Sequence, residues 1–338
     1  MKKKIFFGLV LVFLLTVLGG FFYFYNQVYF GHGSEKAVVI FEIKKGEGNN
    51  EIISSLAQKK IISGKIEIYY YLYINHLSKQ IMPGVYMLSG NLTIPEVAHI
   101  ITNPEAQAVK ITFPEGTTSR DMATILKKNN FDGDGFLEIV KNIPANYRTR
   151  YAFLADQKID SLEGYLFPDT YFFKKDATAE AIIKKMLDNF EGRMTAQILS
   201  DIKDQNKSVK DIVIMSSIIE KEVQAASDMK IVASIFWNRI LIGMPLQSDA
   251  TLSFALNDKN DSHSIEQTKL DSPYNSYANK GLPPGPISNP GMNAILAAVY
   301  PQKTNYAYFL TAGTGVNKKV YYAKTYEEHL ANKKMAGI

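Results

Sequence analysis

The feature that most constrains this chain is a continuous apolar run close to its N-terminus, at residues 5–25. The run holds no charged residue, and none follows it before Glu35. About 20 apolar residues in a helix are enough to cross the hydrocarbon core of a bilayer. Three lysines precede the run, and positive charge favours the cytoplasmic side of a membrane. The sequence therefore predicts a cytoplasmic tail over residues 1–4, a single membrane-spanning helix over 5–25 and an extracytoplasmic remainder.

A cleaved signal peptide is the alternative interpretation of this run. Its apolar segment would be shorter, and it would end in a small-x-small cleavage site. The run instead ends in bulky aromatic residues at 21–25. The chain has no cysteine, which excludes a lipid-modified cysteine, disulfides and thiolate metal sites. We therefore expect an uncleaved anchor in the cytoplasmic membrane.

The rest of the chain has the composition of a folded and nearly neutral protein. Hydrophobic residues make up 46% and charged residues 21% of the sequence, as in globular domains. A length of 338 residues suggests about two domains beyond the anchor. The formal net charge is +5, and the three N-terminal lysines supply much of it. A basic surface for nucleic acid is therefore not expected.

A short pattern occurs twice, at residues 39–57 and 109–127. In each copy an alternating segment is followed by a glycine turn, at Gly46 or Gly116, and then by an amphipathic segment. This order predicts a strand, a turn and a helix. The unit is similar to the first half of a LysM module, a fold type associated with binding polymers of N-acetylglucosamine. We expect a small LysM-like α+β domain over 36–105, with an ordinary small α+β subdomain as the alternative.

The remainder, residues 108–338, is expected to form a larger mixed α+β domain that carries the chemistry. Within it, the stretch 246–290 is rich in Asp, Ser, Asn, Pro and Gly and has little helical periodicity. Long irregular segments in compact domains are uncommon and often build a site. The histidines are scattered without metal-site spacing, so we expect no metal. No GxSxG, SxxK or P-loop motif occurs either. Carboxylate chemistry remains, and it suits the cleavage of glycosidic bonds.

The segment at about 209–226 is predicted to form a helix that carries two glutamates. Glu220 and Glu222 are two residues apart, about 200° around a helix, so both cannot face one cleft. Glu222 follows the apolar residues by one turn, where burial would raise the pKa of its carboxyl group. A general acid needs such a shift to stay protonated near neutral pH. Glu222 is therefore the first candidate acid and Glu220 the second. The alternative is that Glu222 is the buried partner of an Arg or Lys, such as Arg239 on the next helix.

Six motifs follow one another along the second part of the chain: Leu162–Tyr171, Ser217–Glu222, Val232–Arg239, Leu246–Thr251, Tyr274–Tyr277 and Gly281–Ile287. In this order, and with the basic N-terminus, single anchor and LysM-like part, they closely resemble the endolytic murein transglycosylases of the YceG-like (MltG) family. One departure lies near the C-terminus. The family often has a Gly-Gly-His turn after a Tyr-x-Tyr-Phe strand, whereas the turn after Phe309 contains no histidine.

The resemblance implies an enzyme that cuts peptidoglycan strands internally, between N-acetylmuramic acid and N-acetylglucosamine. It implies that the essential glutamate lies in the Glu-Lys-Glu motif, and we map it to Glu222. That carboxyl group would act first as acid and then as base, and the reaction would need no metal or cofactor. The implied partners are the glycan strands, the membrane through the anchor, and peptidoglycan synthases of the bacterial wall.

Polar and aromatic residues in the rigid loops of these motifs are candidate sugar contacts. Planar polar groups bind sugar hydroxyls, and aromatic faces pack against sugar rings. Glu163 and Tyr165 belong to this set, and we expect Glu163 chiefly to fix the loop before Tyr165. The candidates for positioning the sugars are Gln247, Asp249, Tyr274 and Asn275.

Two other functions fit the sequence. A hydrolytic muramidase would cut the same substrate and would need a second carboxylate, for which Asp249 or Asp169 could serve. A non-catalytic scaffold that binds the wall would use the LysM-like part and would not need the glutamate helix. Analysis of the product distinguishes these functions, because only a transglycosylase leaves 1,6-anhydromuramic ends.

Overall fold

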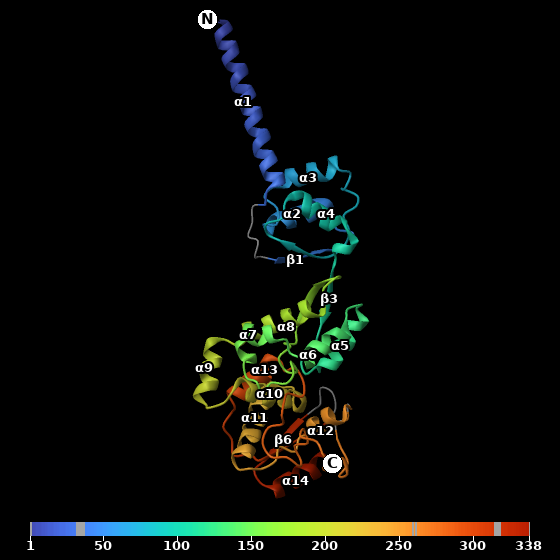
Figure 1. Ribbon diagram of the computed structural model, residues 1–338, viewed down its shortest axis with the longest axis vertical. Helices are drawn as coiled ribbons and strands as arrows, with labels where there is room; N and C mark the ends of the chain where they lie inside the picture. The colour runs from blue at the N-terminus through green and yellow to red at the C-terminus, as the bar shows by residue number, and fades with distance from the viewer. Residues whose placement is uncertain (1, 32–37, 259, 261, 314–318, 338) are drawn as a thin grey trace. The chain divides into compact units, whose positions relative to one another are not determined.

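The chain divides into two compact units in the computed structural model, and we describe each unit by itself (Figure 1). The first comprises residues 1–111 and 171–177, and the second comprises 112–170 and 178–338. Both units combine helices with short two-stranded sheets, which confirms the predicted mixed α+β class. The structure describes residues 2–31, 38–258, 260, 262–313 and 319–337.

The N-terminal helix α1 (Lys2–Tyr29) contains the predicted apolar run and extends beyond it at both ends. It is long and apolar enough to cross a membrane, and its most apolar part is not buried in the protein. By length and composition alone, an anchor and a signal sequence both fit this helix. Near its end, Val28 is buried in the core of the first unit, and Phe24 packs edge-on against Tyr70.

The rest of the first unit is built on an antiparallel pair of strands. β1 (Val38–Ile43) pairs with β2 (Gly84–Ser89), and alternate residues of both strands are buried, as a half-covered sheet requires. A second pair, β3 (Ala108–Thr112) and β4 (Thr170–Lys174), forms its own sheet. The helices are α2 (Asn49–Gln58), α3 (Lys65–Ile74), α4 (Ile94–Thr102) and the short η1 (Pro104–Ala106).

The repeated pattern is confirmed in both copies. β1 leads to α2, and β3 leads to α5 (Ser119–Lys128). Gly46 and Gly116 occupy the turns with φ of 85° and 74°, a left-handed conformation that glycine adopts without steric cost. Thr118 caps α5 by accepting a hydrogen bond from the backbone N–H of Asp121.

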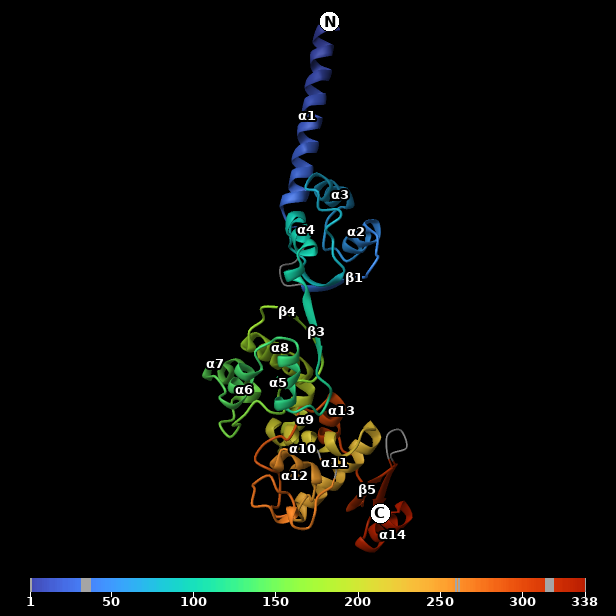
Figure 2. The same ribbon diagram turned by 90° about the vertical axis from the view of Figure 1, so that its right-hand side faces the viewer.

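The second unit is mostly helical and is centred on α10 (Val209–Glu222). Every residue of α10 from Ile212 to Ile219 is buried, because α9, α11, α12 and α13 all pack against it. Figure 2 shows α10 among these helices. The helices of this unit after α5 and before α14 are α6 (Gly133–Lys141), α7 (Ala145–Arg150), η2 (Ala152–Leu154), α8 (Ala179–Arg193), α9 (Ala196–Asp204), α11 (Ala226–Leu241), α12 (Asp249–Leu256), η3 (Gln267–Lys269) and α13 (Met292–Val299).

The stretch 246–290 is less irregular than its composition predicts. It contains α12, whose Thr251 and Leu252 are buried. α12 ends at Leu256, and its C-cap residue Asn257 adopts the left-handed conformation. Packing against α10 therefore stabilises a helix that the sequence pattern alone did not indicate.

The C-terminal part of the second unit is a hairpin covered by one helix. β5 (Tyr308–Ala312) pairs antiparallel with β6 (Lys319–Ala323), and α14 (Tyr326–Ala336) packs on both strands. The turn in which the sequence departs from the family pattern lies largely outside the described residues, at 314–318. None of the residues of α14 is fully buried.

Candidate active site

A cleft of about 1150 Å³ opens in the second unit. Its walls come from segments far apart in the sequence: the start of α5, the end of α10, α12, β5, α14 and the loops around 158–165 and 284–287. Glu220 and Asn275 are not among its described lining residues. The predicted site residues that line it are Glu163, Tyr165, Glu222, Gln247, Asp249 and Tyr274.

Glu222 is the last residue of α10 and lies half-buried in the wall of the cleft. Ser248 Oγ donates a hydrogen bond to Glu222 Oε1. Burial raises the pKa of Glu222 to about 7, and the negative charge of Asp249 contributes to the rise. The hydrogen bond from Ser248 and the positive charge of Arg239 oppose it. Glu222 can therefore hold a proton near neutral pH, as a general acid must.

Arg239 lies near Glu222, but its N–H groups donate hydrogen bonds to other residues. Its Nε donates to the carbonyl oxygen of Ala307 at 2.9 Å, and its Nη1 donates to the carbonyl oxygen of Leu246. Among the described residues, no ion pair joins Arg239 with Glu222. The alternative, in which Glu222 serves only as the partner of Arg239, therefore does not describe this arrangement.

Glu220 has a different environment from Glu222. Its Oε2 accepts a hydrogen bond from the backbone N–H of Gly291 at 2.9 Å. Gly291 is the N-cap residue of α13, so the carboxylate of Glu220 lies at the positive end of that helix. Burial raises the pKa of Glu220, and the hydrogen bond from Gly291 opposes the rise. These contacts indicate a role in joining α10 to α13.

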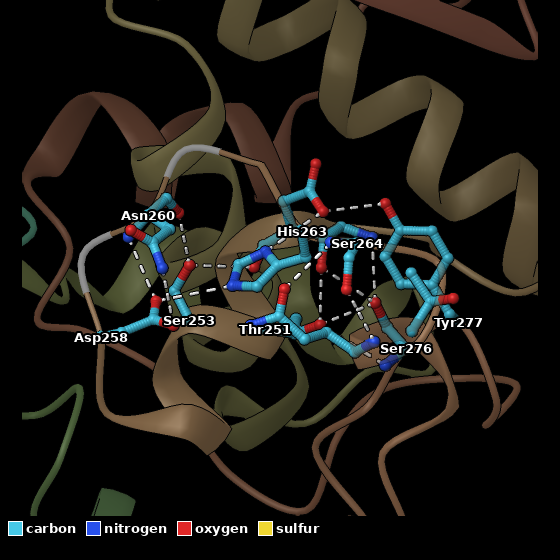
Figure 3. Close-up of polar contacts among 12 residues, drawn as sticks. Thr251, Ser253, Asp258, Asn260, His263, Ser264, Ser276 and Tyr277 are labelled. Atoms are coloured by element: carbon cyan, nitrogen blue, oxygen red, sulfur yellow. Dashed lines mark hydrogen bonds and ion pairs between the residues drawn. The ribbon is translucent and has the colours of Figure 1, made fainter.

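Asp249 lines the cleft and is held by Tyr277 and His263, which Figure 3 shows with their polar neighbours. Tyr277 Oη donates to Asp249 Oδ1 at 3.1 Å. His263 Nδ1 lies 3.4 Å from the same oxygen, and His263 Nε2 lies 3.5 Å from Asp258 Oδ1. The imidazole is fully buried between the two carboxylates. Asp249 is thus fixed where its charge acts on Glu222.

Gln247 and Tyr274 present their side chains to the cleft. Gln247 is exposed and has a φ of 51°, and its backbone N–H donates to the carbonyl oxygen of Ser276 at 3.0 Å. The ring of Tyr274 packs against the ring of Phe254, with the centroids 4.9 Å apart. Both positions are compatible with contact to a bound sugar.

Asn275 is buried inside the loop instead. Its Nδ2 donates to the carbonyl oxygens of Thr268 and Leu270, at 3.0 and 2.8 Å. Its Oδ1 accepts from the backbone N–H of Tyr277 at 3.0 Å. The amide of Asn275 therefore holds the loop that carries Tyr274 and Tyr277, and a direct sugar contact by Asn275 stays a prediction.

Glu163 joins three segments of the second unit. Its carboxylate accepts hydrogen bonds from the backbone N–H of Ser119, at 3.0 and 3.1 Å, and from Asn289 Nδ2 at 2.8 Å. Asn289 Oδ1 in turn accepts from the backbone N–H groups of Gly164 and Leu166. Burial raises the pKa of Glu163 to about 7, and the hydrogen bonds from Ser119 and Asn289 oppose the rise. This geometry fits a residue that fixes the loop before Tyr165.

Tyr165 is completely buried although it borders the cleft. Its ring stacks on Phe153 at a centroid distance of 5.9 Å and meets Phe190 edge-on at 5.6 Å. Its hydroxyl has no hydrogen-bond partner among the described residues. The ring is therefore a packing element beneath the cleft.

Ser248, Tyr277 and Asn289 are site residues that sequence reasoning did not single out. Ser248 lies between two predicted site residues, and Tyr277 lies in the same short motif as Tyr274. Their motifs therefore indicated a site at these positions. Asn289 lies in a proline-rich run, and nothing in that run indicates that it bonds to Glu163. Among the described residues, no group of three His, Cys, Asp or Glu side chains could hold a metal ion.

The site combines a large cleft with one half-buried carboxyl group that can hold a proton near neutral pH, an arrangement typical of the class of enzymes that use a general acid. Residues 41–335 match the YceG-like family, and the chain belongs to this family. This confirms the family predicted from the motifs.

The sequence of this chain is similar to those of named relatives over most of its length. It is 32% identical to the endolytic murein transglycosylase of Bacillus subtilis (strain 168), over 93% of this chain and 89% of that protein. It is 29% identical to the endolytic murein transglycosylase of Streptococcus pneumoniae (strain D39), over 95% of this chain and only 63% of that longer protein. A crystal structure of a YceG-like protein from Listeria monocytogenes matches with a TM-score of 0.62 and 33% identity, covering 88% of this chain and 99% of that one.

Proposed function

We propose that this protein is an endolytic lytic transglycosylase anchored in the bacterial cytoplasmic membrane. Its substrate is the glycan strand of peptidoglycan, cut between N-acetylmuramic acid and N-acetylglucosamine. Relatives named endolytic murein transglycosylases support the reaction. The observation that carries the site assignment is Glu222, a half-buried carboxyl group with a pKa of about 7 in the wall of a large cleft.

The reaction uses Glu222 twice. As an acid it protonates the glycosidic oxygen, and the bond from that oxygen to C1 of the muramic acid breaks. As a base the resulting carboxylate takes the proton from the C6 hydroxyl of the same muramic acid, whose oxygen bonds to C1. The product is a 1,6-anhydro ring, Glu222 is protonated again, and no water is consumed. An intramolecular nucleophile replaces a bound water because it is already positioned.

The neighbours of Glu222 have separate roles in this proposal. Positive charge develops at C1 as the bond breaks, and the fixed carboxylate of Asp249 stabilises it. Ser248 orients Glu222 through their hydrogen bond. Gln247 and Tyr274 position the sugars from the cleft wall.

The anchor and the first unit complete the proposal. α1 crosses the membrane with its N-terminus in the cytoplasm, and retention of the helix is supported by the burial of Val28 in the core of the first unit. The first unit, with its strand-turn-helix order, is a LysM-like module that binds the glycan strand outside the membrane. An anchored enzyme of this kind would act beside the synthases that make new strands.

Product analysis tests the proposal. Full-length protein in detergent is incubated with uncrosslinked glycan strands, with and without a strong chelator, and the fragments are weighed by mass spectrometry over time. We expect anhydromuramic ends, fragments of many lengths early in the digest, and equal activity in the chelator. The Glu222→Gln variant is the control.

Each other outcome assigns a different function. Reducing muramic ends without the anhydro species would make the protein a muramidase, with a water replacing the C6 hydroxyl. Steady release of one disaccharide size would make it an enzyme that acts at strand ends. Binding to the strands without any product would make it a scaffold.

A further inference from the structure

The lining of the cleft includes a cluster of aromatic rings that the reaction above does not use. Tyr308 comes from β5, and Tyr326 and His329 come from α14. The ring of Tyr308 lies 5.5 Å from that of His329 and 5.9 Å from that of Tyr326, and Tyr326 lies 6.2 Å from His329. All three residues line the same cleft as Glu222. We call them the aromatic platform.

The aromatic platform remains accessible in the folded protein. The side chain of Tyr326 is 54% exposed, and Tyr308 and His329 are half-buried. A tyrosine whose purpose was core packing would be expected to bury most of its surface. These rings therefore present aromatic surface to the space inside the cleft.

Arg239 lies beside the aromatic platform, and its charge also acts on Glu222. Its guanidinium lies over the ring of Tyr308, 5.5 Å from the centroid. Its positive charge opposes the rise in the pKa of Glu222 that burial causes, and it adds to the lowering of the pKa of His329 that comes chiefly from burial. The aromatic platform is therefore a continuation of the candidate active site rather than a separate surface.

We propose that the aromatic platform is a sugar subsite that holds a pyranose ring of the glycan strand next to the bond cleaved at Glu222. A pyranose ring has an apolar face of C–H groups that packs against aromatic rings, while the hydroxyls at its rim bond to polar tips such as those of tyrosine. A cleft of about 1150 Å³ that is lined both by Glu222 and by these rings has room for a substrate longer than one sugar. The inference rests on the proposed function, since it takes the occupant of the cleft to be a glycan.

Substitution of Tyr326 tests the aromatic platform because this ring is its most exposed member. We expect Tyr326→Ala to raise KM for uncrosslinked strands on the order of tenfold, with a much smaller change in kcat, because ring stacking contributes to binding rather than to proton transfer. Tyr326→Phe keeps the ring and loses only the hydroxyl, so it should raise KM much less than Tyr326→Ala does. Tyr326→Leu keeps apolar bulk for α14 without a flat ring, and should behave like Tyr326→Ala.

Leu330 supplies the matched control. It lies on the same helix, is 47% exposed and is not among the described residues that line the cleft. Leu330→Ala should leave KM unchanged in full-length protein. An equal KM in Tyr326→Ala and Leu330→Ala, with both folded, would overturn the inference.

A binding measurement separates this inference from the proposed function. Full-length Glu222→Gln protein, with and without Tyr326→Ala, is titrated with uncrosslinked strands in detergent. We expect roughly tenfold weaker binding when Tyr326 is removed. Equal binding overturns the aromatic platform even if the wild type cleaves strands. If the wild type cleaves nothing, the proposed reaction fails, and this titration still decides whether the aromatic platform binds glycan.

Discussion

At the scale of single residues, Glu220 and Glu222 differ in what surrounds their carboxyl groups. Glu222 faces the cleft and bonds to the hydroxyl of Ser248, whereas Glu220 bonds to the backbone of Gly291 at the start of α13. A hydroxyl can reorient when the acid loses its proton, whereas a backbone N–H favours a carboxylate that stays charged. The environment of Glu222 therefore suits a group that gives up a proton and takes it back.

The first prediction compares the two glutamates. Glu222→Gln keeps the size of the side chain but cannot transfer a proton, so strand cleavage should fall by about 10² to 10⁴ with the melting temperature little changed. Glu220→Gln should reduce the rate of cleavage far less, because an amide oxygen can still accept the hydrogen bond from the backbone N–H of Gly291. Initial rates and melting curves of both variants measure this. A reversed order of effects, with both variants folded, would assign the acid to Glu220.

The second prediction concerns pH. The reaction needs protonated Glu222, so the rate should fall as the pH rises through about 7, the pKa to which burial raises this group. Asp249→Asn removes a negative charge that raises the pKa of Glu222, so the fall should move to lower pH. Ser248→Ala removes a hydrogen bond that lowers it, so the fall should move to higher pH. Profiles of kcat/KM against pH measure both shifts, and shifts in the same direction would contradict this account.

At the scale of elements, the N-terminus of α5 is tied to two loops by one carboxylate. Glu163 bonds to the first turn of α5 through Ser119 and to Asn289 from the proline-rich run. A buried N–H group or amide has been removed from water, and this costs free energy. When the group loses its acceptor, no hydrogen bond offsets that cost. The position of α5 against the cleft therefore depends on a residue 44 positions away in sequence.

The third prediction concerns this connection. Glu163→Ala should destabilise the second unit by about 3 kcal/mol, because it leaves the N–H of Ser119 and the amide of Asn289 unpaired. Glu163→Gln should lower the free energy of unfolding by less than Glu163→Ala does. It should also change how that free energy depends on pH. Burial raises the pKa of Glu163 from 4.5 to about 7, so its contribution makes the wild type less stable as the pH rises through that window. Denaturant unfolding at pH 5 and pH 8 measures this, and an unchanged pH dependence in Glu163→Gln would count against it.

At the scale of the whole molecule, α1 combines an exposed apolar part with an end that is buried in the first unit. Most of the helix is apolar and unburied, as a bilayer requires, but Val28 belongs to the core of the first unit. Burying a valine side chain contributes roughly 1.5–3 kcal/mol. Removal of the whole helix should therefore release the protein from the membrane and also weaken the first unit.

The fourth prediction separates these effects with two truncations. Protein that begins at residue 33 should appear in the soluble fraction, whereas the full-length chain stays with the membrane. A version that begins at Gln27 keeps Val28 and should melt at a higher temperature than the shorter one. Fractionation and thermal unfolding provide the two measurements. Soluble, shortened protein from the full-length gene would show instead that α1 is a cleaved signal.

Several features of this protein follow from the sequence alone because their causes are local. The apolar run predicts α1 by length and charge, and the glycine turns at Gly46 and Gly116 predict the two strand-turn-helix units. The periodicity of residues 211–223 predicts α10 and separates its two glutamates onto different sides. In each case the interactions that decide the structure lie within a few residues of one another.

The tertiary structure alone decided which distant side chains meet. Glu163 bonds to Asn289 across 126 positions, and His263 lies buried between Asp249 and Asp258 in a stretch without clear periodicity. The aromatic platform joins β5 to α14, and the amide of Asn275 turns inward to its own loop. Such contacts arise when helices pack around α10 and bury polar groups that must then find partners. No local pattern encodes those partners, because burial and distance are set by the whole packed unit.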